Sequence, residues 1–545
     1  AQMIAVDTIS DVLQSRCGSF CSTDDVMIYK AKENTRRALE SRNPAERQNH
    51  LSESLRLFMK GARILDFDKL REVIGDYQQL NYAQGAVELP LYCAEALDPD
   101  RLGVEFWYKN PSLPWPDASA PASNAASSAP STSAVALTSV DSRREFWEKR
   151  AKCYSLVLNS LETLETKALK GGDEAERVRS HAYELAFASS DEMFHCRLYE
   201  WLISRGLADE LLEMRPQYLE AYLKRDPPTV DKYQLLWQFY VKDGQPIKAA
   251  EVLCALAESV DFQLPLTRRL EYLTLAVGNA KAHPVSVGGQ YESAIAFLTD
   301  LEEKLEVAQV QLEIFNVLSP LAQKQSDPEL RERVELLEKG LFNVTELYQV
   351  YAEPYDLPTV KLLIIHVSQH RDERLVTEIW SRLIDDIVAQ NLPPAETADA
   401  IQAQVVPLGQ RFYPSDSAFP FRHIAMLLVR FHLAHVDDIP PGWVPRILVQ
   451  CGIPYAEVWD VLHQMYDSQV PPFNTQSAVQ TISSAICILL QDWVDTAKRN
   501  PSEFFPADRV DSAVDVYLRE LETGEAREAT REGYERIRRE LRRNW

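Results

Sequence analysis

With 545 residues the chain is longer than one hydrophobic core supports, because cores stop growing at about 250–300 residues, so several domains or an extended repeat architecture are expected. Only 18 glycines and few runs that alternate apolar with polar residues argue against a large β-sheet. The formal net charge of −23 argues against nucleic acid and anionic lipid as direct partners, since an acidic surface repels phosphates.

The first part of the chain reads as a series of amphipathic helices. Apolar residues recur three and four positions apart in HLSESLRLFMKGARIL, residues 50–65, and in FDKLREVIGDYQQLNYA, residues 67–83. This spacing gives each helix one apolar stripe, which needs a neighbouring helix to cover it. We expect residues 1–116 to form the N-terminal helical part of a solenoid.

The helical pattern breaks in the stretch that begins GVEFWYKNPSLPWP at Gly103. Residues 117–140 are rich in Ser, Ala and Pro and are predicted to be a disordered insert, after which residues 141–545 form the main solenoid. Four aromatic residues beside this insert fall outside helical periodicity: Phe106, Trp107, Tyr108 and Trp115. They are candidates for anchoring a partner peptide. The alternative is that they fold back and cap an exposed helix end.

A helical hairpin is predicted in YQLLWQFYVKDGQPIKAAEVLCALAES, residues 233–259. Apolar residues recur at helical spacing on both sides of a central corner. Gly244 suits the left-handed turn that ends a helix, and Pro246 suits the first turn of the next helix, where its missing N–H costs nothing. Ala249 and Ala250 allow close approach of a neighbour. Such pairs bury their stripes against further pairs, so the pattern predicts stacking.

Helices alternate with Pro-marked corners through the rest of the chain. The segment from Tyr291 to Val317 has apolar residues at steps of three and four and predicts one helix of roughly 40 Å. Its stripe lasts too few heptads to require a coiled coil. No strict sequence period emerges, so the predicted fold class is all-α, an irregular α-helical solenoid of stacked helix pairs.

The sequence holds no motif of a known enzyme class, such as a Gly-rich phosphate loop, GxSxG or HExxH. His366 and His370 lie four apart on one predicted helix face, the geometry of two zinc ligands, and His432 and His435 form a similar pair. Neither pair has a Cys or carboxylate companion in register. We therefore expect no catalytic residue, no metal and no cofactor.

Eight cysteines without framework spacing indicate reduced thiols and an intracellular protein, and Cys17 and Cys21 lack the second pair that a zinc ribbon requires. No apolar run is long enough to span a bilayer. The C-terminal stretch REGYERIRRELRRNW is locally basic, but its Glu residues alternate with Arg at ion-pair spacing. It is expected to be a solvated helix with paired charges.

Four segments resemble, in this order, the C-terminal region of the nucleoporin 155/170 family: LYEWLISRGLADELLEMRPQYLEAYL, YQLLWQFYVKDGQPIKAAEVLCALAES, LPLTRRLEYLTLAVGNA and LEEKLEVAQVQLEI. The resemblance covers Phe194 to Phe315 and continues collinearly on either side. It implies a long α-helical solenoid that follows an N-terminal β-propeller absent from this chain. It also implies a structural role in the inner ring of the nuclear pore complex, at the nuclear envelope. The missing initiator Met agrees with a C-terminal fragment.

The resemblance further implies partners. These are linker nucleoporins, with short segments of the GLFG-bearing linker nucleoporin foremost, and other inner-ring nucleoporins, while membrane contact belongs to the propeller half. No catalytic motif and no binding residue can be carried over. The leading hypothesis is a non-enzymatic scaffold that supports nucleocytoplasmic transport. An α-solenoid adaptor of a vesicle-coat or trafficking complex is the alternative, and a helical enzyme with zinc at His366 and His370 is a third.

Overall fold

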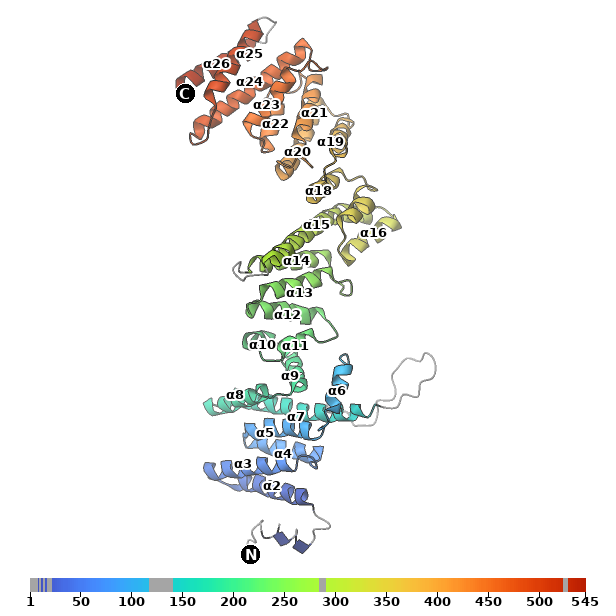
Figure 1. The fold of residues 1–545 in the computed structure, drawn as a ribbon, viewed down its shortest axis with the longest axis vertical. Coiled ribbons are helices and arrows are strands. Elements are labelled where there is room, and N and C mark those ends of the chain that lie inside the picture. The colour runs from blue at the N-terminus through green and yellow to red at the C-terminus, as the bar shows by residue number, and fades with distance from the viewer. Residues whose placement is uncertain are drawn as a thin grey trace. The chain divides into compact units, whose positions relative to one another are not determined.

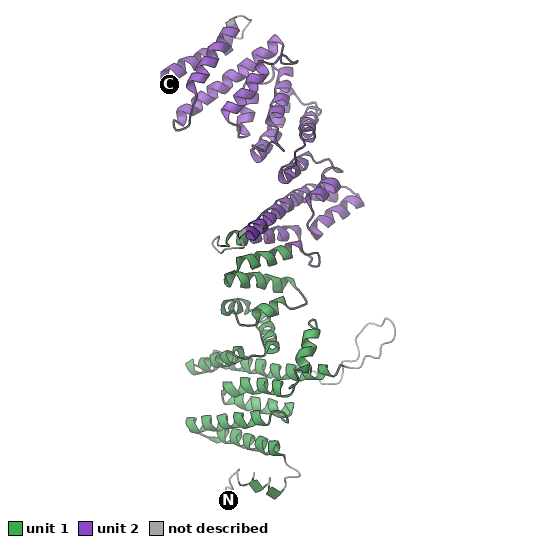
Figure 2. Ribbon diagram, in the orientation of Figure 1, with its two compact units in different colours: residues 1–256, 278–287 green, residues 257–277, 288–545 purple. Residues whose placement is uncertain are grey.

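The computed structural model describes residues 8, 11, 12, 15, 16, 22–116, 141–283, 291–522 and 528–545. Across these ranges the regular elements are helices and no strand occurs (Figure 1). The chain divides into two compact units, residues 1–256 with 278–287, and residues 257–277 with 288–545 (Figure 2). The predicted insert lies outside the described residues. The prediction of an all-α fold is confirmed.

The helices of the first unit are α2 (Thr23–Glu40), α3 (Pro44–Lys60), α4 (Phe67–Gln79), α5 (Ala83–Ala96), α6 (Leu102–Lys109), α7 (Arg143–Lys170), α8 (Asp173–Phe187), α9 (Glu192–Ser204), α10 (Ala208–Met214), α11 (Leu219–Lys224), α12 (Val230–Lys242) and α13 (Pro246–Glu258). The end of α13, from Ala257 on, is assigned to the second unit.

The helices of the second unit are α14 (Leu266–Lys281), α15 (Tyr291–Lys324), α16 (Pro328–Lys339), α17 (Val344–Glu346), the π-helix η1 (Leu347–Ala352), α18 (Pro358–Ser368), α19 (Glu373–Val388), α20 (Pro394–Phe412), α21 (Phe421–Ala434), α22 (Trp443–Gln450), α23 (Tyr455–Tyr466), α24 (Gln476–Arg499), α25 (Ala507–Glu522) and α26 (Glu528–Asn544). The last residues of α14, from Gly278 on, are assigned to the first unit.

Neighbouring helices of the first unit pack side by side as layers (Figure 1). Helix α2 packs on α3, α3 on α5, α5 on α7, and α7 on α8. Aromatic side chains such as Phe58, Tyr77 and Tyr154 are fully buried between these layers. Because α5 precedes residues 117–140 and α7 follows them, helices on both sides of that segment share one hydrophobic core. The apolar stripes of these helices are covered by neighbouring helices, as a stack of helix pairs requires.

The second unit has its own core, built in the same way. Helix α15 packs on α16 and α18, α19 on α20 and α21, and α24 on α22, α23 and α26. Trp380 of α19 is fully buried, and its indole N–H donates a hydrogen bond of 2.9 Å to the carbonyl oxygen of Ala418. Tyr517 and Tyr534, which are also buried, stack with ring centroids 5.4 Å apart between α25 and α26.

The hairpin predicted at residues 233–259 forms as α12 and α13. Gly244 has φ of +71°, a left-handed conformation that favours glycine, and Pro246 is the first residue of α13. Ala249 and Ala250 are fully buried. A corner of this kind is specified by adjacent residues, so local sequence signals were sufficient to predict it.

Helix α15 is longer than predicted, since it continues beyond Val317 to Lys324 and contains Pro320. A proline inside a helix removes one hydrogen bond and leaves the carbonyl of the residue four positions earlier without a donor. That residue is Asn316, and both Asn316 and Pro320 are exposed. The freed carbonyl group therefore lies on the solvent side of the helix, and the buried stripe on the opposite face stabilises the helix.

Arg269 of α14 is a cation in the interior of the second unit, with 0% of its surface exposed. Among the residues that the structure describes it has no carboxylate partner; its guanidinium group instead donates hydrogen bonds to five backbone carbonyl groups. Nη1 bonds Ala257 at 2.8 Å and Ser259 at 2.6 Å, Nη2 bonds Phe262 at 3.3 Å and Lys339 at 3.0 Å, and Nε bonds Leu264 at 3.2 Å. These bonds satisfy acceptors at the end of α13 and in the segment that follows it. Burial lowers the pKa of Arg269.

Candidate partner-binding surface

Three of the four aromatic residues singled out in the sequence lie on helix α6, where no regular element was predicted. That part of the sequence interpretation was wrong. The helix has only eight residues, which is too short for an apolar period to become visible. Val104, Phe106 and Trp107 form its buried face, and this burial against the rest of the unit stabilises it.

The start of α6 is fixed against α7 by a buried carboxylate. Oδ2 of Asp98 accepts a hydrogen bond of 3.0 Å from the backbone N–H of Gly103 and one of 2.7 Å from Nε of Arg150. A Cβ atom on Gly103 would lie 2.8 Å from backbone atoms of both Phe146 and Trp147. The backbones of α6 and α7 therefore meet directly, which only glycine permits at this position.

The same arginine ties α7 to α9. Asp98, Arg150 and Asp191 are 1%, 3% and 8% exposed in their side chains, and Nη1 of Arg150 lies 3.2 Å from Oδ2 of Asp191. Tyr154 also donates to the Asp191 carboxylate. Burial and the neighbouring Asp191 raise the pKa of Tyr154 well above its ordinary value, so it remains a neutral donor. This network holds α6, α7 and α9 in one arrangement.

Phe106, Trp107 and Trp115 face the interior of the first unit. The ring of Phe106 lies 5.7 Å from that of Trp147, and Trp115, which is half-buried, stacks on the same ring at 6.1 Å. The guanidinium group of Arg225 lies 3.7 Å from the centroid of the Trp107 ring and donates to the Trp107 carbonyl oxygen. These three side chains position α6.

Tyr108 is the member of the group that offers its ring to solvent, with 49% of its surface exposed. Its hydroxyl donates a hydrogen bond to the Glu192 carboxylate at the start of α9. Burial of part of the side chain, together with that hydrogen bond, raises the pKa of Tyr108 to about 12. Beside the ring is a hollow of about 270 Å³, lined by Tyr108, Pro111, Glu192, Cys196, Ala221, Lys224, Arg225 and Asp226.

The thiol and one of the cations at this hollow lie in unreactive surroundings. Its thiol, Cys196, is buried, and burial raises its pKa to about 12, so it is not a reactive thiolate. Lys224 is paired with Glu220 at 2.9 Å. The remaining charges are of both signs, and the apolar contribution comes from the Tyr108 ring, Pro111 and Ala221.

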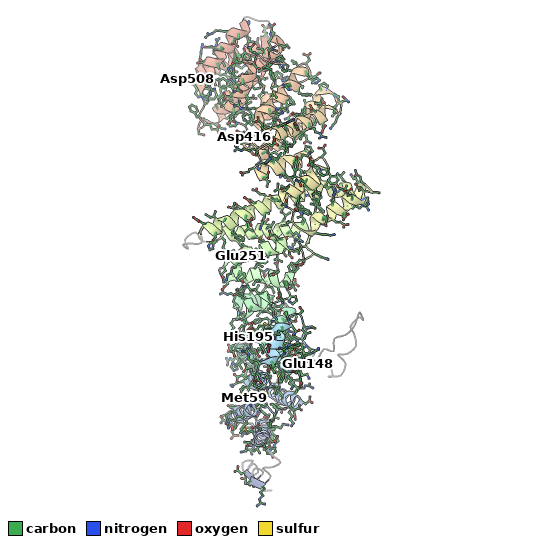
Figure 3. All side chains as sticks on the ribbon, turned by 45° about the vertical axis from the view of Figure 1, so that its right-hand side comes forward. Met59, Glu148, His195, Glu251, Asp416 and Asp508 are labelled. Atoms are coloured by element: carbon green, nitrogen blue, oxygen red, sulfur yellow. The ribbon has the colours of Figure 1, made fainter. Side chains whose placement is uncertain are left out.

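A larger hollow of about 570 Å³ lies in the second unit at the starts of α19 and α21, and Asp416, labelled in Figure 3, lines it. Nε2 of His423 in its wall lies 3.1 Å from Oγ of Ser381, as in a nucleophile and base pair. The imidazole forms its other hydrogen bond with the backbone of Thr377 rather than with an orienting carboxylate, and burial lowers the pKa of His423. Within the described ranges no carboxylate orients this imidazole, so the third member of a catalytic triad is missing.

The histidines considered as zinc ligands lie in ordinary surroundings. The ring of His366 packs 5.2 Å from that of Phe412, whereas His370 is exposed. His432 is buried, and the ring of His435 lies 4.9 Å from that of Phe431. In the part of the chain that the structure describes, no three His, Cys, Asp or Glu side chains are placed to hold a metal ion. Nor is any helix described there long and apolar enough to cross a membrane.

Comparison with known proteins decides the family. The model of the family described as "Non-repetitive/WGA-negative nucleoporin C-terminal" matches residues 1–531. The chain belongs to this nucleoporin family. The nucleoporin 155/170 resemblance and the predicted helical solenoid are thereby confirmed, and the family is one of structural scaffold nucleoporins and not of enzymes. This nucleoporin is accordingly a component of the nuclear pore complex in the nuclear envelope.

Curated relatives of this nucleoporin include NUP170 of Chaetomium thermophilum, 27% identical over 537 residues, which cover 91% of this chain and 35% of the relative. A probable nucleoporin of Schizosaccharomyces pombe is 26% identical over 501 residues, with the same two coverages. The nuclear pore complex protein Nup154 of Drosophila melanogaster is 26% identical over 466 residues, covering 82% of this chain and 32% of the relative. The chain thus spans about a third of the length of these relatives.

Two solved structures of Chaetomium thermophilum Nup170 are also similar. Nup170 SOL has a TM-score of 0.73 at 26% identity and covers 99% of this nucleoporin chain and 70% of its own. The Nup170 CTD in complex with Nup145N has a TM-score of 0.71 at 25% identity, and the match covers 95% of this chain and 98% of the Nup170 chain.

Sequence reasoning found the aromatic group but missed the residues that position it. Asp98, Arg150, Glu192 and Arg225 lie on separate helices or turns and belong to no motif. Arg225 contacts Trp107 across 118 positions of sequence. In a solenoid without a strict period, no spacing rule connects such residues.

Proposed function

We propose that this chain is a non-enzymatic scaffold segment of the nuclear pore inner ring that binds short segments of a linker nucleoporin and so supports nucleocytoplasmic transport. The observation that carries the proposal is the similarity, over 95% of the chain, to a Nup170 CTD solved with Nup145N bound. The proposed partners are the GLFG-bearing linker nucleoporin and other inner-ring nucleoporins. Direct contact with nucleic acid or membrane is not part of the proposed role.

Within the aromatic group we assign the partner contact to Tyr108, with Phe106, Trp107 and Trp115 acting indirectly by holding α6 in place. A half-exposed aromatic ring beside a hollow fits an interface anchor, since aromatic side chains dominate interface hot spots. The buried Asp98–Arg150–Asp191 network makes the position of α6 rigid before a partner arrives. Preorganisation of this kind lowers the entropic cost of binding.

Isothermal titration calorimetry of the full chain with segments of a GLFG-bearing linker nucleoporin tests both parts of the proposal. We expect saturable binding, weakened about tenfold or more by Tyr108→Ala. Tyr108→Phe keeps the ring and loses the hydrogen bond to Glu192, so it should bind within about threefold of the original chain. Tyr92→Ala is the matched control, because Tyr92 of α5 has almost the same exposure, 46%.

Absence of saturable heat with every linker segment would contradict the proposed function. Saturable binding that Tyr108→Ala leaves unchanged would contradict the assigned surface alone. The vesicle-coat alternative predicts a different location in the cell, and membership of a nucleoporin family favours the pore. Fluorescence of the tagged protein at the nuclear rim, as against vesicles, distinguishes the two.

A further inference from the structure

The last helix, α26, presents a strongly basic surface in an acidic protein. Tyr534, Ile537 and Leu541 form its buried face. On the opposite side the C-terminal half of the helix carries four arginines, Arg536, Arg539, Arg542 and Arg543, each of them exposed. We refer to these four as the arginine face. The whole chain has 81 acidic and 58 basic residues, whereas residues 536–545 contain five arginines and one glutamate, so this segment locally reverses the charge of the molecule.

The ion pairs that sequence spacing predicted along α26 do not form among its described residues, and that interpretation was wrong. Glu540 binds Lys498 of α24, and Arg538 pairs with Asp515 of α25 at 3.4 Å. Nε of Arg539 donates to the backbone carbonyl of Glu535, not to its carboxylate. Ion pairs with the neighbouring helices α24 and α25 thus replace the ion pairs that were expected within α26.

The result is a set of exposed guanidinium groups that form no direct ion pair among the described residues, while the charge of Arg536 contributes to lowering the pKa of the Glu540 carboxyl. Arg536, Arg542 and Arg543 form no hydrogen bond or ion pair with the residues that the structure describes. A guanidinium group presents five donors in a planar fork that matches a carboxylate. Three unpaired forks on one helix end therefore provide a surface on which carboxylates can bind in pairs of hydrogen bonds.

Aromatic side chains lie next to the same helix end. Trp545, directly after α26, is 52% exposed, and its ring lies 4.8 Å from that of Phe505. Phe505 is buried and packs against Trp493 at 5.2 Å, whereas its neighbour Phe504 is 91% exposed. Arg and Trp exposed at one helix end, with the exposed Phe504 next in sequence to the ring that Trp545 contacts, have the composition of an interface core.

We propose that the arginine face binds a short acidic segment of a partner protein, whose carboxylates pair with Arg536, Arg539, Arg542 and Arg543 and whose apolar side chain packs on Phe504. An extended polyanion fits less well. Helix α25 packs on α26 and carries exposed acidic groups such as Asp508, labelled in Figure 3. A lipid surface or a duplex would bring its phosphates against these groups, while a short peptide contacts the arginine face alone.

A purely structural role for these arginines predicts a different behaviour. Cations in the last turn of a helix interact favourably with the helix dipole, which would explain Arg542 and Arg543 without any partner. Arg536 and Arg539 lie earlier in α26, outside that last turn. Substitution of Arg536 and Arg539 therefore distinguishes ligand binding from helix stabilisation.

The test uses the full chain and a fluorescein-labelled peptide of Glu and Leu residues, titrated by fluorescence anisotropy. We expect saturable binding that weakens as ionic strength rises, falls about tenfold in the R536Q/R539Q variant and falls severalfold in F504A. The R71Q/R374Q variant is the control, because it loses the same charge from two exposed arginines that are paired with Asp68 and Glu378. Its binding should stay within about twofold, and all variants should keep their helical circular dichroism.

Any of the following results would overturn the proposal. One is an acidic peptide that does not bind, or that binds R536Q/R539Q as well as the original chain. Another is that phosphatidylserine vesicles or duplex DNA bind more tightly than the acidic peptide and that R536Q/R539Q abolishes this binding. The arginine face would then bind a polyanion and not a protein segment. A Lys and Leu peptide of equal length should not bind, and equal affinity for it would also refute charge recognition.

Discussion

Replacement of Arg269 by Met should strongly destabilise the second unit. The side chain is fully buried, and its guanidinium group donates to the carbonyls of Ala257, Ser259, Phe262, Leu264 and Lys339. Met fills similar volume but donates no hydrogen bond. A buried carbonyl left without a donor costs about 1–3 kcal/mol. If water reaches all but two of the five, the loss is about 2–6 kcal/mol, and we expect a value near the middle of that range.

The neighbouring residue supplies a control. Arg268 has a side chain that is 52% exposed and paired with Glu271 at 2.7 Å. A surface ion pair contributes about 0–1 kcal/mol, so Arg268→Met should change the free energy of unfolding little. Arg269→Lys keeps the charge but reaches fewer carbonyls, because one ammonium group replaces a planar fork. The free energy of unfolding of Arg269→Lys should lie between the values for the original chain and for Arg269→Met.

Urea denaturation followed by far-ultraviolet circular dichroism measures these differences, with hydrogen exchange of residues 257–264 as a local readout. The amides of that segment should lose protection in Arg269→Met and keep it in Arg268→Met. If the two variants had the same unfolding midpoint, the five hydrogen bonds would not stabilise the unit as argued. If midpoints differed but the segment kept its protection, the role of Arg269 would be in packing and not in satisfying carbonyls.

Three further predictions concern pH, packing and metals. Burial lowers the pKa of His195, labelled in Figure 3, whose ring nitrogens contact Tyr199 Oη at 2.8 Å and the Ser189 carbonyl oxygen at 2.6 Å. Because the unfolded chain binds this proton more readily, the contribution to stability should be complete above about pH 6.5 and fall as the pH drops toward the lower folded pKa, a dependence that His195→Gln should remove in denaturation curves. Gly103→Ala should cost about 1–3 kcal/mol by overpacking α7, while Gly75→Ala, with open space around its Cβ position, should not lower the melting temperature. Treatment with EDTA should leave the melting temperature unchanged, and a drop that zinc reverses would contradict the expectation of no metal site.

The sequence predicted those parts of the fold that neighbouring residues specify. Gly244 and Pro246 define a corner within three positions, and the apolar stripes on either side need no information from elsewhere. Helix α6 was missed because its eight residues contain little periodicity, and its inner face is defined by contacts with α7 and Arg225. The C-terminal end of α15 was missed because Pro320 reads as a stop signal, although its exposed position leaves the freed carbonyl on the solvent side of the helix.

The candidate site was predicted in part. The aromatic group was recognised from composition, but the difference between Tyr108 and its neighbours depends on which face of α6 is covered. That face is covered by residues more than a hundred positions away, such as Arg225 against Trp107. Because the chain has no strict repeat period, those contacts cannot be predicted from sequence spacing. Burial in the structure was needed to separate an exposed ring from those that hold the helix.

Helix α26 shows why charge patterns are harder to interpret in a helical stack than in an isolated helix. Spacing of four between Glu and Arg stabilises an isolated helix, but a neighbouring helix offers competing partners at equal distance. Glu540 binds Lys498 of α24, and Arg538 binds Asp515 of α25. Each pair formed between helices leaves a charge on the outer face without its intrahelical partner. Unpaired charges therefore gather on the face that no neighbour covers, which is also the face that a partner protein can reach.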